Sequence, residues 1–353
     1  MNATSHVEGL LLFSDDILSI VFNAFLFLVG IPGNCLIIRV YAVKKNNSSA
    51  RIFIIGLAVN DLVLCLIRPL HVFDKLPIAN DLDDFSLFYC KFRDQFELLF
   101  VFTSVLITAC IALDRYYAVC RPFDRVITPQ RATYTLIICI ILSLLVLLPD
   151  VFIYGLVPVS PKRDSEKTFR CKRIAPDGLY YFQLSLYYAA VIGSQTVATV
   201  LCIKIVLALR LQRSKVRPVL NSANIDAAAI PNDASREGRG REVREKDAHS
   251  KTTRMLLLTT VWFILLWIPV LAFYLIPQDI TAKKHFTDSP GLYAIIGFVG
   301  EDSFLINIVI NPLIYSLANK RFRDDSKDVI RKIFYCENIV ERSDTTEVYS
   351  LRT

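Results

Sequence analysis

The chain has 353 residues, of which 54% are hydrophobic and 21% are charged, and its formal net charge is +7. Its mean hydropathy is +0.44. This composition excludes a water-soluble fold, and the long apolar stretches also exclude a disordered chain, a collagen-like chain and a small disulfide scaffold. The sequence therefore predicts an integral membrane protein.

Seven segments are apolar enough to cross a membrane as helices, since about 20 residues of helix span a ~30 Å hydrocarbon core. In chain order they are Ile17–Ile38, Ile52–Ile67, Leu98–Leu113, Ala132–Pro149, Gly178–Ile203, Met255–Gln278 and Ser289–Asn319. Asp61 interrupts the second segment, and Glu301 and Asp302 interrupt the seventh. The alternating ten-residue strands of a membrane barrel are absent from the sequence. The pattern predicts an all-α membrane protein, with a seven-transmembrane helix bundle over residues 17–319.

The basic residues predict how this bundle is oriented. An odd number of spans puts the termini on opposite sides, and more than two thirds of the 40 Lys and Arg residues lie on the carboxyl-terminal side. The positive-inside rule therefore places residues 1–16 outside the cell and the tail, residues 337–353, in the cytoplasm. Residues 1–16 lack the features of a removable signal peptide, so we expect the first span to be a retained signal anchor. The basic inner face suits anionic membrane lipids and an intracellular protein partner, not nucleic acid.

Two segments on the inner side have different patterns. Residues 212–250 carry charges of both signs and have no apolar period, which predicts a flexible third inner loop. Residues 320–336 space apolar residues at helical period among Lys, Arg and Asp, which predicts a short amphipathic eighth helix on the membrane surface. Cys336 at its end is a candidate lipidation site, and the alternative is an ordinary reduced thiol.

Two modifications are predicted on the outer side. Cys90 precedes the third span and Cys171 lies between the fourth and fifth, and they are the two cysteines on the oxidising face. Compartment and topology therefore allow a disulfide between them, which would hold the loop Val151–Asp177 over the helix ends. Asn2 heads the sequon Asn2-Ala3-Thr4 and is the predicted glycosylation site.

Polar residues inside the spans predict an ion site, because each costs a few kcal/mol in a bilayer and so usually marks function. Asp61, Ser104, Asn307 and Asn311 could meet at one depth of the bundle. A carboxylate with hydroxyl and amide oxygens suits a small hard cation, with Na⁺ as the candidate. The alternative is a water-filled hydrogen-bond network without an ion.

Short motifs at fixed depths in the spans indicate the family. They are Gly33-Asn34, Leu57-Ala58-Val59-Asn60-Asp61-Leu62, Cys90, Asp114-Arg115-Tyr116, Pro122-Phe123, Cys171, Phe263 with Trp267-Ile268-Pro269, Asn311-Pro312-Leu313-Ile314-Tyr315, and Phe322. One three-residue match occurs by chance, whereas the whole ordered set is specific. From Asn34 to Phe322 the chain resembles the rhodopsin-like (class A) G-protein-coupled receptors, and in type the peptide receptors. The resemblance implies a plasma-membrane receptor that activates heterotrimeric G proteins and also binds arrestin and receptor kinases.

The resemblance also implies roles for single residues. Arg115 is held by Asp114 at rest and is released on activation to meet the G protein, while Phe123 inserts into the G-protein surface. Trp267 responds to ligand binding and drives the sixth helix outward. The other residues of this coupling and switch group are Tyr116, Phe263, Pro269, Asn311, Pro312 and Tyr315. Asp61, Ser104, Asn307 and Asn311 match the family's sodium site.

The chain departs from the family pattern at three places. The Trp expected in the fourth span is missing, with Cys139 or Ile140 near its position, and no Pro interrupts Gly178–Ile203. The Tyr expected near the inner end of the fifth span is replaced by Cys202 or Ile203. We therefore expect a straighter fifth helix and a less stable active state.

The ligand is predicted from charge. Glu97, Glu301 and Asp302 can converge on one pocket of a net acidic outer face, and the stretches Gly155–Val159 and Phe169–Ile174 could pair as a hairpin, a feature of peptide receptors. These features favour a cationic or amidated peptide over a small biogenic amine. The candidate ligand-binding residues are Glu97, Glu301, His71, Leu98, Val101, Tyr187, Tyr188 and Tyr274. Glu97 is expected to be partly buried and unpaired, and the alternative is an internal pair with Arg68 or Arg93.

Other classes fit less well. A retinal pigment needs a lysine in the seventh span, and Ser289–Asn319 has none. An enzyme needs a nucleophile or metal constellation, and no such motif occurs, so we expect no catalytic residues and no cofactor apart from allosteric Na⁺. A channel or transporter needs polar residues along several spans, whereas Asp61 is the one ionisable residue expected at mid-membrane depth.

Overall fold

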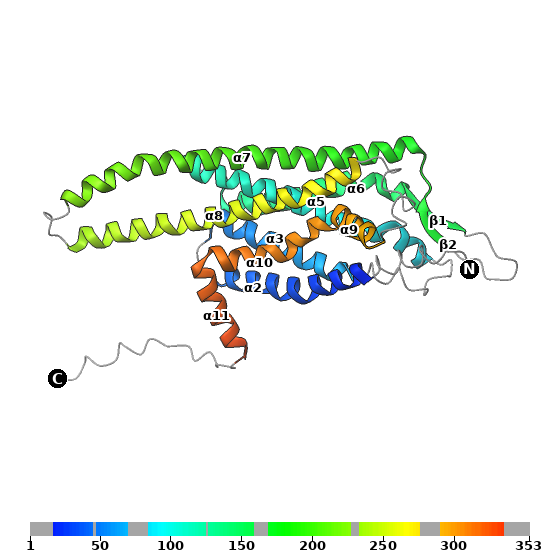
Figure 1. The fold of residues 1–353 in the computed structure, drawn as a ribbon, viewed down its shortest axis with the longest axis horizontal. Coiled ribbons are helices and arrows are strands. Elements are labelled where there is room, and N and C mark those ends of the chain that lie inside the picture. Colours follow the sequence, from blue (N-terminus) through cyan, green and yellow to red (C-terminus); the bar gives the residue numbers. More distant parts are fainter. Residues whose placement is uncertain are drawn as a thin grey trace.

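The computed structural model describes residues 17–44, 47–69, 84–124, 126–158, 169–226, 233–275 and 290–334. Long helices run side by side along its longest axis, with a small hairpin at one end of the bundle and a helix turned across the other end (Figure 1). We refer to these as the hairpin end and the α11 end.

The helices follow the predicted spans in chain order. The first span begins at Ile17 and continues through a π-helical turn, η1 (Leu26–Gly30), into α2 (Ile31–Ala42). The next spans are α3 (Ser49–Ile67), α5 (Asp84–Cys120) and α6 (Pro129–Leu147), which ends in a 3-10 turn, η2 (Leu148–Phe152). They are followed by α7 (Asp177–Asp226), α8 (Asp233–Leu275), α9 (Pro290–Glu301), the 3-10 turn η4 (Ser303–Ile306), α10 (Asn307–Ala318) and α11 (Lys320–Phe334).

Six of the described helices are long and apolar enough to cross a membrane, and Ser303–Ala318 forms a shorter apolar helix. The seventh segment is therefore a broken span, interrupted at Asp302 between α9 and η4. Large apolar side chains face outward, as on α6, where Ile137 and Ile141 are 49% and 50% exposed. Lipid tails solvate such an apolar surface, whereas exposing it to water would be energetically unfavourable. The predicted all-α membrane fold is therefore confirmed.

Local chemistry fixes where individual helices begin. The Ser48 side chain accepts a hydrogen bond from the backbone N–H of Arg51 at 3.4 Å, and Thr128 accepts one from Arg131 at 3.3 Å. Each satisfies an N–H group that has no partner inside its own helix. Pro129 stands in the first turn of α6, where its missing N–H costs nothing.

The first and seventh spans approach closely at Gly33. A Cβ added there would lie 2.7 Å from Cγ of Pro312, so any larger residue would push the two helices apart. The side chain of the next residue, Asn34, donates to the carbonyl oxygens of Gly30 at 2.9 Å and Ile308 at 3.1 Å. Glycine and asparagine together let α2 and α10 share a hydrogen-bonded contact inside the apolar core.

The predicted hairpin is confirmed with nearly the expected bounds. β1 (Tyr154–Pro158) and β2 (Phe169–Arg173) pair antiparallel, with Leu156 opposite Cys171. The strands lie at the end of the bundle beside α5 (Figure 1).

The other end differs from the flexible loop predicted for residues 212–250. α7 stays helical to Asp226 and α8 is helical from Asp233, so both helices extend well beyond the bundle (Figure 1). Many residues of these extensions are good helix formers, and local propensity continues a helix that packing has already begun. The amphipathic α11 forms as predicted, with Phe322 1% exposed and stacked 6.0 Å from Tyr41.

Candidate functional site: a cavity at the hairpin end and polar clusters below it

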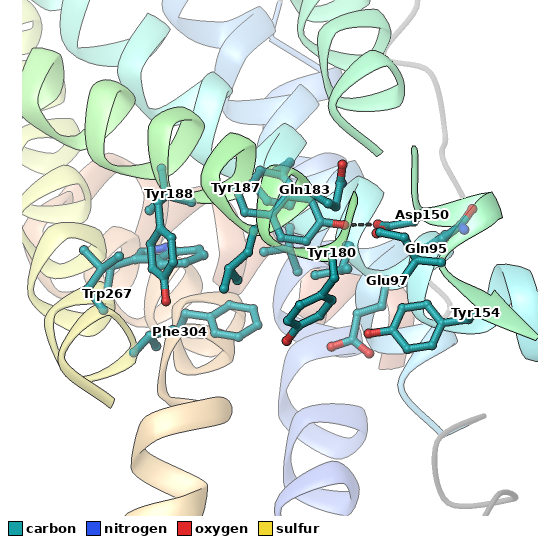
Figure 2. A pocket seen from close by; sticks show the side chains of 18 of the residues that line it. Gln95, Glu97, Asp150, Tyr154, Tyr180, Gln183, Tyr187, Tyr188, Trp267 and Phe304 are labelled. Atoms are coloured by element: carbon teal, nitrogen blue, oxygen red, sulfur yellow. Dashed lines mark hydrogen bonds between the residues drawn. The ribbon is translucent and has the colours of Figure 1, made fainter. Parts of the chain in front are cut away.

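A cavity of about 490 Å³ opens at the hairpin end of the bundle. Five of the predicted ligand-binding residues line it: Glu97, Leu98, Val101, Tyr187 and Tyr188. Figure 2 shows tyrosines and acidic side chains around the same space. His71 lies outside the described residues, as do the side chains of Tyr274 and Glu301, whose backbones belong to α8 and α9.

Glu97 is not the unpaired carboxylate that the sequence led us to expect. Its Oε1 lies 2.8 Å from a terminal nitrogen of Arg68, and both side chains are more than nine-tenths buried. That expectation was wrong, and the alternative, an internal pair with Arg68, is what the structure contains. The pair forms because α3 and α5 pack together and present both side chains at the same level.

Arg68 joins four segments. Its second terminal nitrogen lies 2.8 Å from Oδ1 of Asp302, and its Nε donates to Oδ1 of Asn23 at 3.1 Å. The planar guanidinium presents several N–H groups in fixed directions, so one side chain can hold three acceptors at once. We call Asn23, Arg68, Glu97 and Asp302 the arginine cluster. Sequence reasoning missed Asn23 and the pairing of Asp302, since their partner is remote in the chain.

The wall near the hairpin carries a second acidic group. Asp150, at the end of the fourth span, accepts a hydrogen bond from the Tyr187 hydroxyl (Figure 2). The Tyr187 ring also packs 4.9 Å from Phe102 of α5. Tyr180, Leu184 and Tyr187 line the cavity at helical spacing along α7, a signal that the sequence contained. Asp150 was not predicted as a site residue.

Trp267 lies at the deep end of this cavity and is 6% exposed. Its ring stacks on Phe304 of η4 at 5.1 Å and lies 6.2 Å from Phe263. The Ser303 hydroxyl donates to the carbonyl oxygen of Leu266 at 3.0 Å, so η4 is held to α8 beside the tryptophan. Trp267 Nε1 is buried with no hydrogen-bond partner among the described atoms, a cost that water or a rearranged conformation usually removes.

A much smaller cavity, about 10 Å³, lies below Trp267 and is lined by Asp61, Ser104 and Asn307. Asn311 donates to Oδ2 of Asp61 at 2.8 Å, so all four predicted sodium-site residues come together. Three buried oxygens have no hydrogen-bond partner among the described atoms: Oδ1 of Asp61, of Asn307 and of Asn311. The space suits one water or one small ion, and the donor set fits Na⁺.

Four of the predicted coupling residues, Asp114, Arg115, Phe123 and Tyr315, lie towards the α11 end of the bundle. Arg115 pairs with its neighbour Asp114, with Nε 3.0 Å from Oδ2, and Asp114 also accepts from the Ser49 hydroxyl at 2.6 Å. Tyr315 is 1% exposed and its hydroxyl has no partner among the described atoms. Phe123, by contrast, is 97% exposed.

The remaining residues of this group are Tyr116, Pro269 and Pro312. Tyr116 lies beside Tyr117, with ring centroids 5.6 Å apart, and Pro269 and Pro312 both lie inside helices.

The cysteines fall into two groups. Within the described ranges, Cys90 is disulfide-bonded, whereas six cysteines are free: Cys35, Cys65, Cys110, Cys120, Cys139 and Cys202. The side chain of Cys171, the predicted partner of Cys90, lies outside the described residues, as do Asn2 and Cys336. Cys139, one of the two residues near the position of the expected fourth-span Trp, is buried, with its sulfur 3.9 Å from that of Cys110, and Cys202 is buried in α7.

Known proteins resemble this chain over most of its length. The sequence profile of the 7 transmembrane receptor (rhodopsin family) matches residues 33–315. The chain is 22% identical to the neuromedin U receptor homolog nmur-2 of Caenorhabditis elegans, a match covering 86% of this chain and 77% of the relative. It is 24% identical to the cholecystokinin receptor type A of Cavia porcellus, covering 86% and 78%. It is also 23% identical to the octopamine receptor beta-1R of Drosophila melanogaster, covering 88% and 61%.

The profile covers well over half of the chain and spans the helices that form both cavities and the Asp114–Arg115 pair. The protein therefore belongs to the rhodopsin family of G-protein-coupled receptors. It is a multi-pass membrane protein of that family.

Proposed function

We propose that the protein is a cell-surface receptor that binds an extracellular peptide in the cavity at the hairpin end and activates heterotrimeric G proteins. The observation that carries the proposal is the cavity itself, with Trp267 at its deep end and the Asp114–Arg115 pair at the opposite end of the same bundle. A ligand in the cavity can touch Trp267 directly, and α8 extends from Trp267 to the α11 end.

A peptide fits the cavity better than a small amine. The lining mixes tyrosines, amides and charges of both signs, including Arg68, Lys91 and Glu97, so several parts of a larger ligand find partners. Two of the relatives named above are a neuromedin U receptor homolog and a cholecystokinin receptor. Of the cationic or amidated peptides expected from the sequence, the Arg68–Glu97 pair favours an amidated one. An amide group can donate to Glu97 and accept from Arg68 within the same cluster, whereas a peptide cation would compete with Arg68.

The amine alternative rests on the octopamine receptor among the relatives. An amine receptor of this type needs a carboxylate that the ligand ammonium can pair with. Glu97 already pairs with the buried guanidinium of Arg68, so an ammonium would have to compete with it. Breaking a buried pair costs several kcal/mol, which weakens this alternative.

The intracellular partners are assigned by resemblance. A G protein would take up Arg115 after its release from Asp114 and would bury Phe123, and receptor kinases and arrestin would bind the same end later. Membrane lipids would cover the apolar side of α11, and lipidation of Cys336 would add a second anchor. With the amino terminus outside, as the positive-inside rule predicts, the hairpin end would face the outside of the cell. We expect no catalytic activity and no nucleic-acid binding.

On the outer side we propose a disulfide between Cys90 and Cys171, together with a glycan on Asn2. The bond would fix β2 to the start of α5 and keep the hairpin beside the cavity. Cys171→Ser should lose surface expression and ligand binding together, because removing a disulfide of this kind typically costs about 2 to 5 kcal/mol. Non-reducing peptide mass spectrometry checks the bond, and two free thiols at these positions would contradict it.

We also propose that Na⁺ occupies the site formed by Asp61, Ser104, Asn307 and Asn311. The three buried oxygens without hydrogen-bond partners support this assignment. An ion that prefers one conformation stabilises that conformation, so Na⁺ and agonist should each alter the affinity of the other by the same factor.

The test of the receptor function is ligand-dependent nucleotide exchange. Membranes containing the full chain are mixed with purified heterotrimeric G proteins, and GTPγS binding is measured against a library of short peptides, amidated and free-acid, and a panel of biogenic amines. We expect stimulation by a peptide, and none with the Arg115→Ala variant at equal surface expression. Stimulation by an amine alone would transfer the assignment to the alternative, and no stimulation by any library member at several G-protein classes would contradict the proposal.

A further inference from the structure

We propose that Arg68 and Asp302 are positioning residues that connect the ligand cavity to Trp267, so that a ligand can act on the tryptophan through the arginine cluster. The inference rests on the proposed receptor function and adds a route that the family motifs do not contain.

The first link is the ion pair between α3 and the break in the seventh span. Arg68 lines the cavity, is 6% exposed and binds Asp302 at 2.8 Å. Its other terminal nitrogen binds Glu97, which also lines the cavity. Glu97 and Asp302 therefore share one guanidinium, that of Arg68. A ligand group that binds Glu97 would shift this guanidinium and so change its contact with Asp302.

The second link is the backbone at Asp302. This residue directly precedes η4, and its carbonyl oxygen accepts the N–H of Leu305 at 3.0 Å, so it forms the first turn of that 3-10 segment. Two residues further on, Phe304 stacks on Trp267 at 5.1 Å, and Ser303 is hydrogen-bonded to Leu266. The ring pair is visible in Figure 2. A shift of Asp302 moves a single short turn, and that turn carries the ring against which Trp267 packs.

The third step concerns the conformation in which these contacts are made, which is the resting one. Arg115 pairs with Asp114, which is the arrangement that the family resemblance assigns to the resting receptor. The proposal is that the Arg68–Asp302 contact is made in the resting conformation and lost in the active one, in which case removing it shifts the population towards the active conformation. We therefore expect the Arg68–Asp302 pair to restrain basal activity.

The test uses the full-length receptor in lipid nanodiscs and Asp302→Asn, which removes the charge and leaves Arg68 its bonds to Glu97 and Asn23. We expect ligand-free GTPγS exchange to rise about three- to tenfold at equal receptor amount, within the range found for coupling residues. The conservative Asp302→Glu should return exchange towards the wild-type rate. The matched control is Asp177→Asn, whose carboxylate lies 2.8 Å from Arg173 but is exposed, and it should leave exchange unchanged.

A double-mutant cycle separates the proposed contact from independent effects. If Arg68→Gln and Asp302→Asn act through one contact, the double variant should exchange no faster than the more active single variant. Additive effects, unchanged exchange or a decrease in the well-expressed Asp302→Asn variant would each overturn the proposal.

A second readout does not depend on a G protein. The chain has two tryptophans, and Trp262→Phe leaves Trp267 as the one source of tryptophan emission. In that background, Asp302→Asn should shift the emission maximum or its quenching by acrylamide, and Asp177→Asn should not. Unchanged emission would overturn the route through Trp267 even if exchange increased. If the wild-type receptor activates no G protein, the proposed function fails, while the emission measurement still tests the connection.

Discussion

The arginine cluster and the cluster around Asp61 bind their carboxylates with different partners. At the hairpin end, Glu97 and Asp302 share the guanidinium of Arg68, a cation that the chain itself supplies. Below Trp267, Asp61 is bonded by the neutral amide of Asn311, and no Lys or Arg side chain in the described ranges forms an ion pair with it. A cluster with its own cation resists exchange with solvent ions, whereas a carboxylate among neutral oxygens can be modulated from outside the chain.

The largest effect is expected from Arg68→Met. This change removes the guanidinium that joins the buried Glu97 to the partly buried Asp302. Losing one partner of a buried pair costs about 3 to 5 kcal/mol of unfolding free energy. Thermal unfolding of the purified receptor and surface staining of cells measure it. Arg173→Met, which breaks an exposed pair, should cost at most about 1 kcal/mol. Equal losses of unfolding free energy in both variants would show that the arginine cluster stabilises the protein no more than an exposed ion pair does.

Glu97→Gln should cost less, about 2 kcal/mol, because Arg68 keeps Asp302 and Asn23 and loses one charged hydrogen bond. Thermal unfolding under the same conditions gives the comparison. A loss as large as that of Arg68→Met would mean that Glu97, rather than Arg68, is the centre of the cluster.

At the second cluster, Asp61→Asn should abolish the response to Na⁺. At a concentration about ten times its dissociation constant, Na⁺ stabilises the wild type by about 1.4 kcal/mol, and the neutral amide removes the one formal charge that holds it. The measurement is the change in Tm between NaCl and N-methylglucamine chloride at equal ionic strength. A sodium-dependent Tm that survives in the variant would favour the water-network alternative.

The smallest effect is expected from Ser104→Ala, which removes one neutral oxygen and keeps Asp61. The sodium-dependent gain in unfolding free energy should decrease by less than about 1 kcal/mol, since a neutral hydrogen-bonding group contributes about that much. Titration of Tm against Na⁺ concentration resolves the altered affinity. Complete loss of the sodium response would mean that the Ser104 hydroxyl is as important for Na⁺ binding as the Asp61 carboxylate, which would contradict the expected order of effects.

The sequence was sufficient for the second cluster but not for the first. Asp61 and Asn311 belong to family motifs whose depth in the membrane is known, so their meeting was predictable. Whether Arg68 faces Glu97 depends on the rotation of α3 about its axis relative to α5. An apolar period of 3.6 residues shows which face of a helix is buried, but not which residue of the neighbouring helix a given side chain meets. Asn23 and Asp302 add partners from spans whose packing is set by distant contacts such as Gly33 against Pro312.

The two ends of the bundle also differed in how well the sequence predicted them. The hairpin was predictable because alternating residues flank Cys171 within a short loop. The helical extensions of α7 and α8 were not, because a polar segment without an apolar period reads as a loop even when its residues are good helix formers.

Phe123 stands apart from all of these contacts, because a side chain that is 97% exposed contributes almost nothing to the stability of the isolated chain. Its apolar surface remains available to whatever covers that end. Burying a phenylalanine is worth about 1.5 to 3 kcal/mol, which corresponds to roughly a ten- to hundredfold difference in dissociation constant. A partner that covers this one loop residue could therefore gain affinity without any change in the fold of the chain.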